Sequence, residues 1–407
     1  MRFAVSLQQT KDPALGLEAA VQETFSCLEG LPIHAVFLFV SSLYKTDWRP
    51  LLGFIRREWG DPLVLGCTGG GVLGKDRELE STPALSLAAA HLPRVELHPF
   101  TISTEESAQP QAPGFWIEKL GATPSEDPIG ILLPEPFSCD VMTLVSSLQA
   151  AYPKLPLIGG LASGAQEAGE NALFLNEEVV KEGAVGLLLT GDVTLQTIVA
   201  QGCRPIGRAF IITKAEENVI LELAGLPATE ALRQILDTLP EKDRRLAQRA
   251  LFLGIVMDER KEKFGCGDFL IRNLIGMDRS MGALAIGDRV RVGQTVQFQV
   301  RDADSSKEDL QLLLKESIST SSPMPSTGGL LFSCLGRGQD LYGEPHYDLR
   351  TIQAALGNIP IAGFFCNGEI GPVGGHNFVH GFTSSLGLFR PRSALKGDSP
   401  SRTVPSS

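Results

Sequence analysis

The sequence has no Cys-x-x-Cys pair, and its seven cysteines are scattered along 407 residues. An odd number of widely separated cysteines does not fit a disulfide framework, and no zinc-ligand spacing is present. We therefore expect free thiols in a reducing compartment, which predicts a cytoplasmic location. The same absences lead us to expect neither a metal nor a cofactor.

Long apolar runs and basic clusters are also missing. No apolar stretch approaches the roughly 18 residues of a membrane span. The polar pair Gln8-Gln9 ends the N-terminal apolar stretch too early for a signal peptide. The formal net charge is -11, and basic residues are scattered in pairs such as Arg56-Arg57. We therefore expect neither nucleic acid nor a membrane among the partners.

Two familiar sequence patterns fail. The chain has no Gly-x-Ser-x-Gly elbow for a serine nucleophile. The glycines Gly69-x-Gly71-x-x-Gly74 satisfy the dinucleotide fingerprint formally. A Rossmann site needs a long apolar helix directly after them, whereas residues 75–80 are polar and Pro83 follows. We therefore do not expect nucleotide binding.

What the sequence does contain is one pattern repeated three times. An apolar, strand-like run is followed by a gap of helical length, and then by a proline, small or apolar residues and glycines. The copies span residues 36–66, 129–160 and 330–363. This spacing fits a strand, a helix and a return strand. A strand pair follows each copy, as in residues 183–201, where Gly191-Asp192 predicts a hairpin turn.

Each copy ends in a glycine-rich bend, at residues 66–71, 159–164 and 367–371. Glycine tolerates positive φ and has no side chain, so such bends expose backbone N–H groups and allow close approach. Three matched bends predict a composite cavity. The alternative is that the glycines only turn the chain.

These features predict an α/β fold with two related lobes of mixed β-sheet covered by helices, built from repeated strand-helix-strand-hairpin units. A doubly wound parallel sheet would need a helix after each glycine bend, and none is indicated. We place a domain change near residue 225, which gives domains at 1–225 and 226–390. Residues 391–407 have little apolar content and predict a disordered tail.

The densest group of polar residues lies in the third copy. Arg337 stands between two glycines just after a strand, where a guanidinium is free to pair with a carboxylate. Glu369 follows the neighbouring strand, so both charges should emerge at one sheet edge, where a zwitterion would find them. The alternative is an ion pair that only fixes the loop. The predicted ligand contacts are Arg337, Gly338, Asn367, Gly368, Glu369, Gly66, Thr68, Gly69, Gly159, Gly160 and Ser163.

Cys366 offers the best case for covalent chemistry. With His376 or His380 it would form a Cys-His nucleophile. Phe364-Phe365 place the thiol at the end of an apolar strand, which favours a buried structural cysteine. The two histidines would share a helix face as metal ligands, but the surrounding glycines argue against a helix.

Four segments together resemble FIST-domain proteins, a family named for F-box and intracellular signal transduction proteins. They are residues 183–189, 201–207, 267–273 and 363–371. The resemblance covers roughly residues 30–390, as a FIST N-terminal part followed by a FIST C-terminal part. It implies a sensory module that binds a small ligand, for which amino acids are proposed. We expect a stand-alone form that signals through a partner protein.

The leading hypothesis is therefore a cytoplasmic ligand-binding sensor without catalytic activity. One competing hypothesis is a thiol-dependent or amidohydrolase-like enzyme that uses Cys366 with His376 or His380. The other is a protein-interaction scaffold in which the glycine bends are only turns.

Overall fold

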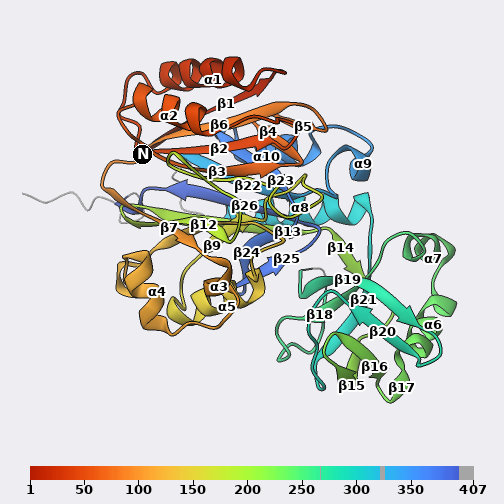
Figure 1. The fold of residues 1–407 in the computed structure, drawn as a ribbon. Coiled ribbons are helices and arrows are strands. Elements are labelled where there is room, and N and C mark those ends of the chain that lie inside the picture. Colours follow the sequence, from red (N-terminus) through yellow and green to blue (C-terminus); the bar gives the residue numbers. More distant parts are fainter. Residues whose placement is uncertain (266, 321–325, 394–407) are drawn as a thin grey trace, which may run out of the picture.

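The structure is a computed structural model that describes residues 1–265, 267–320 and 326–393 (Figure 1). Residues 394–407, which make up most of the tail predicted at 391–407, lie outside the described residues, as does Cys266. Within the described part the strands form three sheets of six strands and one of eight.

Sheets 1, 2 and 3 share one strand order. Sheet 1 runs β1 (Arg2–Gln9), β6 (Ala84–His91), β2 (Ala35–Ser41), β3 (Leu63–Gly69), β10 (Leu173–Leu175), β11 (Glu178–Val180). Sheet 2 runs β7 (Val95–Ile102), β12 (Ala184–Gly191), β8 (Ile129–Pro134), β9 (Leu157–Gly160), β24 (Glu369–Val373), β25 (His376–His380). Sheet 3 runs β13 (Thr194–Gln201), β26 (Thr383–Arg390), β22 (Gly328–Cys334), β23 (Ile361–Cys366), β4 (Gly71–Gly74), β5 (Arg77–Glu80). In each sheet the two central strands are parallel, and the other pairs are antiparallel.

Each parallel pair is joined by helix, as the spacing predicts. The connections are α2 (Arg49–Glu58), α5 (Val141–Ala151), and α9 (Gln339–Tyr342) with α10 (Tyr347–Leu356). Helix α5 begins after Asp140, whose Oδ1 accepts the N–H of Thr143 at 3.1 Å and so caps the first turn. The remaining helices of this part are α1 (Pro13–Cys27), α3 (Thr104–Ser107), α4 (Pro113–Leu120), the 3-10 turn η1 (Pro124–Glu126) and α8 (Ala303–Thr320).

The three sheets enclose one apolar core, and helices cover their outer faces (Figure 1). Along β2, Phe37 and Phe39 face this shared core, whereas Val36, Leu38 and Val40 pack under α1 and α2. Helices α4 and α5 cover sheet 2, and α8 and α10 cover sheet 3. Strands that are buried on both faces must be apolar throughout, which explains the continuous apolar runs of the repeats.

The repeats interlock by exchanging hairpins. The hairpin β4–β5 follows β3 along the chain but pairs with β23 in sheet 3. In the same way β10–β11 follows β9 but joins β3 in sheet 1, and β24–β25 follows β23 but joins β9 in sheet 2. Each glycine bend therefore carries the chain from one sheet to the next. The mixed α/β architecture of repeated strand-helix-strand-hairpin units is confirmed.

The edge strands are exchanged between sheets as well. Strands β7 and β13 leave their own repeats to become edge strands of sheets 2 and 3, and the N-terminal β1 takes the matching place in sheet 1. The hairpin predicted around Gly191-Asp192 is therefore wrong. Strand β12 pairs with β7 and β8 in sheet 2, whereas β13 pairs with β26 in sheet 3.

One glycine recurs at the same place in every parallel pair. A side chain at Gly66, Gly159 or Gly363 would overlap the carbonyl oxygen of the facing residue, which is a leucine in each case (Leu38, Leu132 and Leu331). The repeated glycine of the sequence pattern thus marks a close approach of two backbones.

Sheet 4 lies to one side of the shared core (Figure 1). Its order is β14 (Cys203–Pro205), β21 (Thr295–Arg301), β15 (Phe210–Glu216), β16 (Val219–Leu223), β20 (Ala283–Ile286), β19 (Phe269–Asp278), β18 (Leu251–Val256), with β17 (Leu226–Pro227) on β16. Because β21 also pairs with β18, the sheet closes on itself. Helices α6 (Ala228–Thr238) and α7 (Glu241–Ala247) pack on it.

The domain change predicted near residue 225 stays a prediction. It falls inside sheet 4, where β16 and β17 pair across it through Leu223 and Leu226. In the described part of the chain, no helix has the length and apolar character needed to cross a membrane.

Candidate ligand-binding site

The three glycine bends meet at Ser163. Its hydroxyl accepts a hydrogen bond from the N–H of Gly70 in the first bend at 2.9 Å and donates one to the backbone oxygen of Phe365, just before the third bend. Its own N–H donates to the backbone oxygen of Thr68 at 3.2 Å. One residue predicted as a ligand contact therefore ties the bends together.

Most of the glycines predicted as ligand contacts lie where the packing leaves no room for a side chain. A side chain at Gly69 would overlap Phe364, and one at Gly160 would overlap the thiol of Cys366. The hydroxyl of Thr68 accepts the N–H of Ala172 at 3.0 Å, which joins β3 to β10. Together with Gly66 and Gly159, these residues have a packing role in the structure, and their contact with a ligand stays a prediction.

Arg337 is fully buried and bound by protein groups. Its Nε and Nη2 donate to Asp348 at 2.7 and 3.0 Å, and Nη2 also donates to the hydroxyl of Tyr342 at 2.6 Å. Burial opposes the charged form, but the Asp348 carboxylate outweighs it and raises the pKa of the guanidinium. Gly338, at φ +90°, packs against the carboxylate of Glu80. The bidentate pair expected of Arg337 exists, but its acid belongs to α10, and contact with a ligand stays a prediction.

Glu369 lies within the third bend and is also fully buried. One carboxylate oxygen accepts the N–H of Thr383 at 3.0 Å. Burial raises its pKa to about 8, against the opposing effect of that N–H and of Arg337. Burial therefore favours the protonated form of this side chain. The carboxyl group expected at this sheet edge is thus buried, and its contact with a ligand stays a prediction.

A cavity of about 550 Å³ opens where the third bend faces sheet 4, and we call it the loop–sheet cavity. Asn367 and Gly368, two predicted contacts, line it, together with Cys334 at the end of β22. The start of α5 contributes Asp140. Sheet 4 supplies three consecutive residues of β19, Ile271, Arg272 and Asn273. The cavity thus joins two repeats of the core to sheet 4.

Arg272 is the charged residue that sequence analysis missed. Its side chain is 8% exposed and donates through Nε to Asp288 at 2.6 Å. Its Nη1 donates to the backbone oxygen of Val379 in β25 at 3.1 Å, so it also bridges sheet 4 and the core. Arg272 lies in the motif at 267–273, but nothing in that motif indicates which residues sheet 4 will face.

The thiols and the histidine at this cavity are uncharged at neutral pH. Cys334 and Cys366 are facing residues on β22 and β23. Burial raises the pKa of Cys334 to about 12 and that of Cys366 well above its usual range. Burial lowers the pKa of His380 to about 4, although its Nε2 bonds to the backbone oxygen of Gly371 at 3.0 Å. Unlike His380, His376 does not line this cavity.

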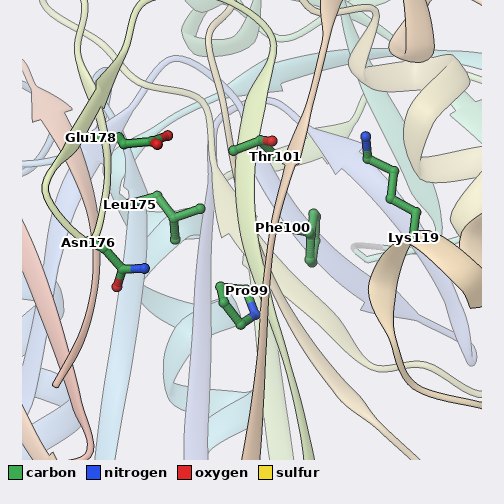
Figure 2. Close-up of a pocket in the computed structure, with 7 residues that line it drawn as sticks. All are labelled: Pro99, Phe100, Thr101, Lys119, Leu175, Asn176 and Glu178. Carbon is green, nitrogen blue, oxygen red and sulfur yellow. The ribbon is translucent and has the colours of Figure 1, made fainter. Parts of the chain in front are cut away.

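A second cavity, of about 440 Å³, is shown in Figure 2. Residues 99–101 of β7 lie between Lys119, on one side, and residues of β10 and β11, on the other. Two of its polar side chains already have protein partners, since Lys119 pairs with Glu106 and Asn176 accepts the N–H of Val64 at 3.3 Å. No glycine bend lines it, so the loop–sheet cavity is the stronger candidate.

Comparison with known proteins agrees with the resemblance seen in the sequence. The FIST N domain matches residues 34–226, and the FIST C domain matches residues 228–372. The chain belongs to the FIST family. FIST domains are generally sensory domains of signal transduction.

Relatives of this FIST protein occur in mycobacteria. An uncharacterized protein of Mycobacterium tuberculosis is 38% identical over 392 residues, which cover 96% of this chain and 100% of the relative. One of Mycobacterium bovis is 34% identical over 390 residues, with 96% and 99% covered. A cyanuric acid hydrolase from A. caulinodans aligns at 9% identity over 96% of this chain and 99% of its own, with a TM-score of 0.33. That score is too low to carry an argument.

Proposed function

We propose that this FIST protein is a cytoplasmic sensor that binds a small ligand in the loop–sheet cavity and signals through a partner protein. One observation carries the proposal. The cavity is walled by the core on one side, through Cys334, Asn367 and Gly368, and by sheet 4 on the other, through Ile271 and Arg272. A ligand held there would contact both bodies, so its binding would be linked to their relative position.

The connection of sheet 4 to the core suits such a role. The chain enters sheet 4 at Gly202 and leaves it at Asp302, and the adjoining Cys203 and Arg301 are paired. Arg204 donates to Asp302 at 2.9 Å across this neck. A narrow two-strand neck allows a ligand in the cavity to change how sheet 4 rests on the core, which a partner could read.

We favour binding over thiol catalysis because of the state of the thiols. A catalytic cysteine needs a thiolate and an adjacent base. Burial raises the pKa of Cys366, and its thiol lies 3.5 Å from the backbone oxygen of Phe364. The ring of His380 is bound to Gly371. Both features support a structural role for these residues.

The proposal is tested with a variant that fills the cavity. Gly287 lines the cavity, and a Cβ there would meet its nearest atom only at 3.9 Å. Gly287→Leu should therefore fold and occupy ligand space. Gly276→Leu, also in sheet 4 but not among the lining residues, is the matched control, with its nearest contact at 3.6 Å. Thermal shift is measured over a metabolite panel that contains amino acids, other carboxylates, phosphates and neutral compounds.

A ligand of this cavity should raise the melting temperature of wild type and of Gly276→Leu, and leave Gly287→Leu unchanged. Equal shifts in all three proteins would place the ligand elsewhere. A panel without any shift, combined with a stable complex with another protein, would favour the scaffold hypothesis instead.

A further inference from the structure

Arg272 has unused hydrogen-bonding capacity beside the loop–sheet cavity. Nε binds Asp288, and Nη1 donates to the backbone oxygens of Ile271 at 3.0 Å and Val379 at 3.1 Å. Its Nη2 is buried and has no partner among the described residues. A buried guanidinium N–H without an acceptor destabilises the fold, so an acceptor from a ligand would offset that cost.

A second guanidinium lies against the wall of the same cavity. Arg301, at the end of β21, has its Cζ 4.8 Å from the ring centroid of Phe382, and a side chain at Gly336 would overlap its Nη1. Phe382 and Gly336 both line the cavity. Nη1 of Arg301 is likewise buried and unpartnered within the described part. Two strands of sheet 4 thus bring unsatisfied cationic groups to one place.

The thiols and the histidine that line the cavity do not counter these charges. Burial raises the pKa of Cys139 and of Cys334 to about 12, so both thiols are protonated. The pKa of His380 is lowered to about 4, so the ring is neutral. The side chain of Asp140 also lines the cavity, where its two oxygens accept the N–H and the hydroxyl of Thr143 at the start of α5. The unpartnered N–H groups of Arg272 and Arg301 therefore offer hydrogen-bond donors to a negative group.

We infer that the loop–sheet cavity binds an anion, through a carboxylate or phosphate group, and that Arg272 holds that group. The planar guanidinium fork matches both groups in geometry. Because Arg272 already bonds to Val379 of the core, an anion at Nη2 would strengthen the contact between sheet 4 and the core. The inference rests on the proposed function, since it names the ligand class of the same cavity.

The test uses the full chain with two simple probes, inorganic phosphate and sodium succinate, at constant ionic strength. Thermal shift and calorimetric titration are applied to wild type and three variants. Arg272→Lys keeps the charge but loses the fork. Asn367→Asp adds a negative charge at an exposed residue that lines the cavity. Asn367 donates a hydrogen bond through its backbone N–H, which the substitution keeps. Asn358→Asp makes the same change at an exposed residue that does not line this cavity.

At least one probe should bind wild type and Asn358→Asp with equal affinity. Arg272→Lys should weaken binding about tenfold or more, the effect of losing a charge-assisted hydrogen bond. Asn367→Asp should weaken it several-fold, which decides the question if Arg272→Lys fails to fold. A stronger response to phosphate than to succinate, or the reverse, identifies the group.

Two outcomes would overturn the inference. Equal shifts in all four proteins would be the general effect of excluded salts on stability. The second is stabilisation of wild type by neutral compounds alone, abolished by Gly287→Leu while neither anion binds. That result would contradict the inference that the ligand is an anion, but it would still support the proposed sensor function.

Discussion

The hydroxyl of Ser163 bonds to the N–H of Gly70 at 2.9 Å, although the two residues belong to different repeats. The same hydroxyl donates to Phe365 of the third repeat. Ser163→Ala should lower the free energy of unfolding by about 1–3 kcal/mol, because it leaves a half-buried N–H and a buried carbonyl without this partner. Chemical denaturation measures this loss. Ser146→Ala, at an exposed site on α5, is the control and should change stability by less than about 0.5 kcal/mol. Equal stability of the two variants would contradict the bridging role.

The repeated glycines give a prediction about the three parallel pairs. Alanine at Gly66, Gly159 or Gly363 should destabilise the protein by about 1–3 kcal/mol or more, because the added methyl group would overlap a backbone oxygen that cannot move freely. Gly276→Ala, whose added methyl group would make an ordinary contact at 3.6 Å, should be nearly neutral. Thermal or chemical unfolding of the four variants checks this. One tolerated substitution among the three would show that the repeats are not equivalent there.

The pair Arg337–Asp348 should matter for stability. Asp348→Asn would leave a buried, uncompensated guanidinium and should cost about 3–5 kcal/mol. The double variant Arg337→Met, Asp348→Leu should recover much of that loss, since it removes both charges. Arg350→Met, at an exposed site on α10, is the control for the loss of an arginine. Unfolding in denaturant measures all three, and a double variant no more stable than Asp348→Asn would be evidence against this account.

We expect the stability of the protein to depend on pH through the titration of Glu78. It is buried on β5, where Oε1 accepts the N–H of Leu349 at 2.8 Å. Burial, with the nearby charge of Asp348, raises its pKa from 4.5 to about 8. Folding therefore favours the protonated form, and its contribution to stability is lost as pH rises from about 4.5 to 8. The slope should reach up to about 1.4 kcal/mol per pH unit.

Glu78→Gln should reduce the slope of that curve, because glutamine cannot ionise and still offers an oxygen to Leu349. The remaining slope comes from Glu369, whose pKa is also raised to about 8. The measurement is the free energy of unfolding at pH 5, 6, 7 and 8 for both proteins. Parallel curves for wild type and Glu78→Gln would show that Glu78 does not titrate as predicted.

Thiol labelling distinguishes the sensor hypothesis from the hypothesis of a thiol-dependent enzyme. Burial raises the pKa of Cys366, whereas Cys27 is exposed on α1. Alkylation of the native protein at neutral pH should modify Cys27 at least about a hundredfold faster, in keeping with the inertness of buried structural thiols. Mass spectrometry of the peptides measures both rates. Rapid, selective labelling of Cys366 would favour the thiol-dependent enzyme.

Much of the architecture was predictable from local patterns. The repeated strand-helix-strand spacing follows from periodicity, which depends on near neighbours along the chain. The glycine bends were also visible, and two of their residues, Asn367 and Gly368, do line the loop–sheet cavity. The hairpin proposed at Gly191-Asp192 failed because turn residues indicate where a strand ends and do not name its partner.

The sequence by itself determined the three repeats, their glycines and the family, because these depend on residue order alone. Only the tertiary structure decided that hairpins are exchanged between repeats, that Arg337 binds Asp348, and that Arg272 faces the third bend. Strand partners and ion pairs are chosen by packing among segments far apart in the chain. A buried charge can be stable only beside the group that this packing brings to it.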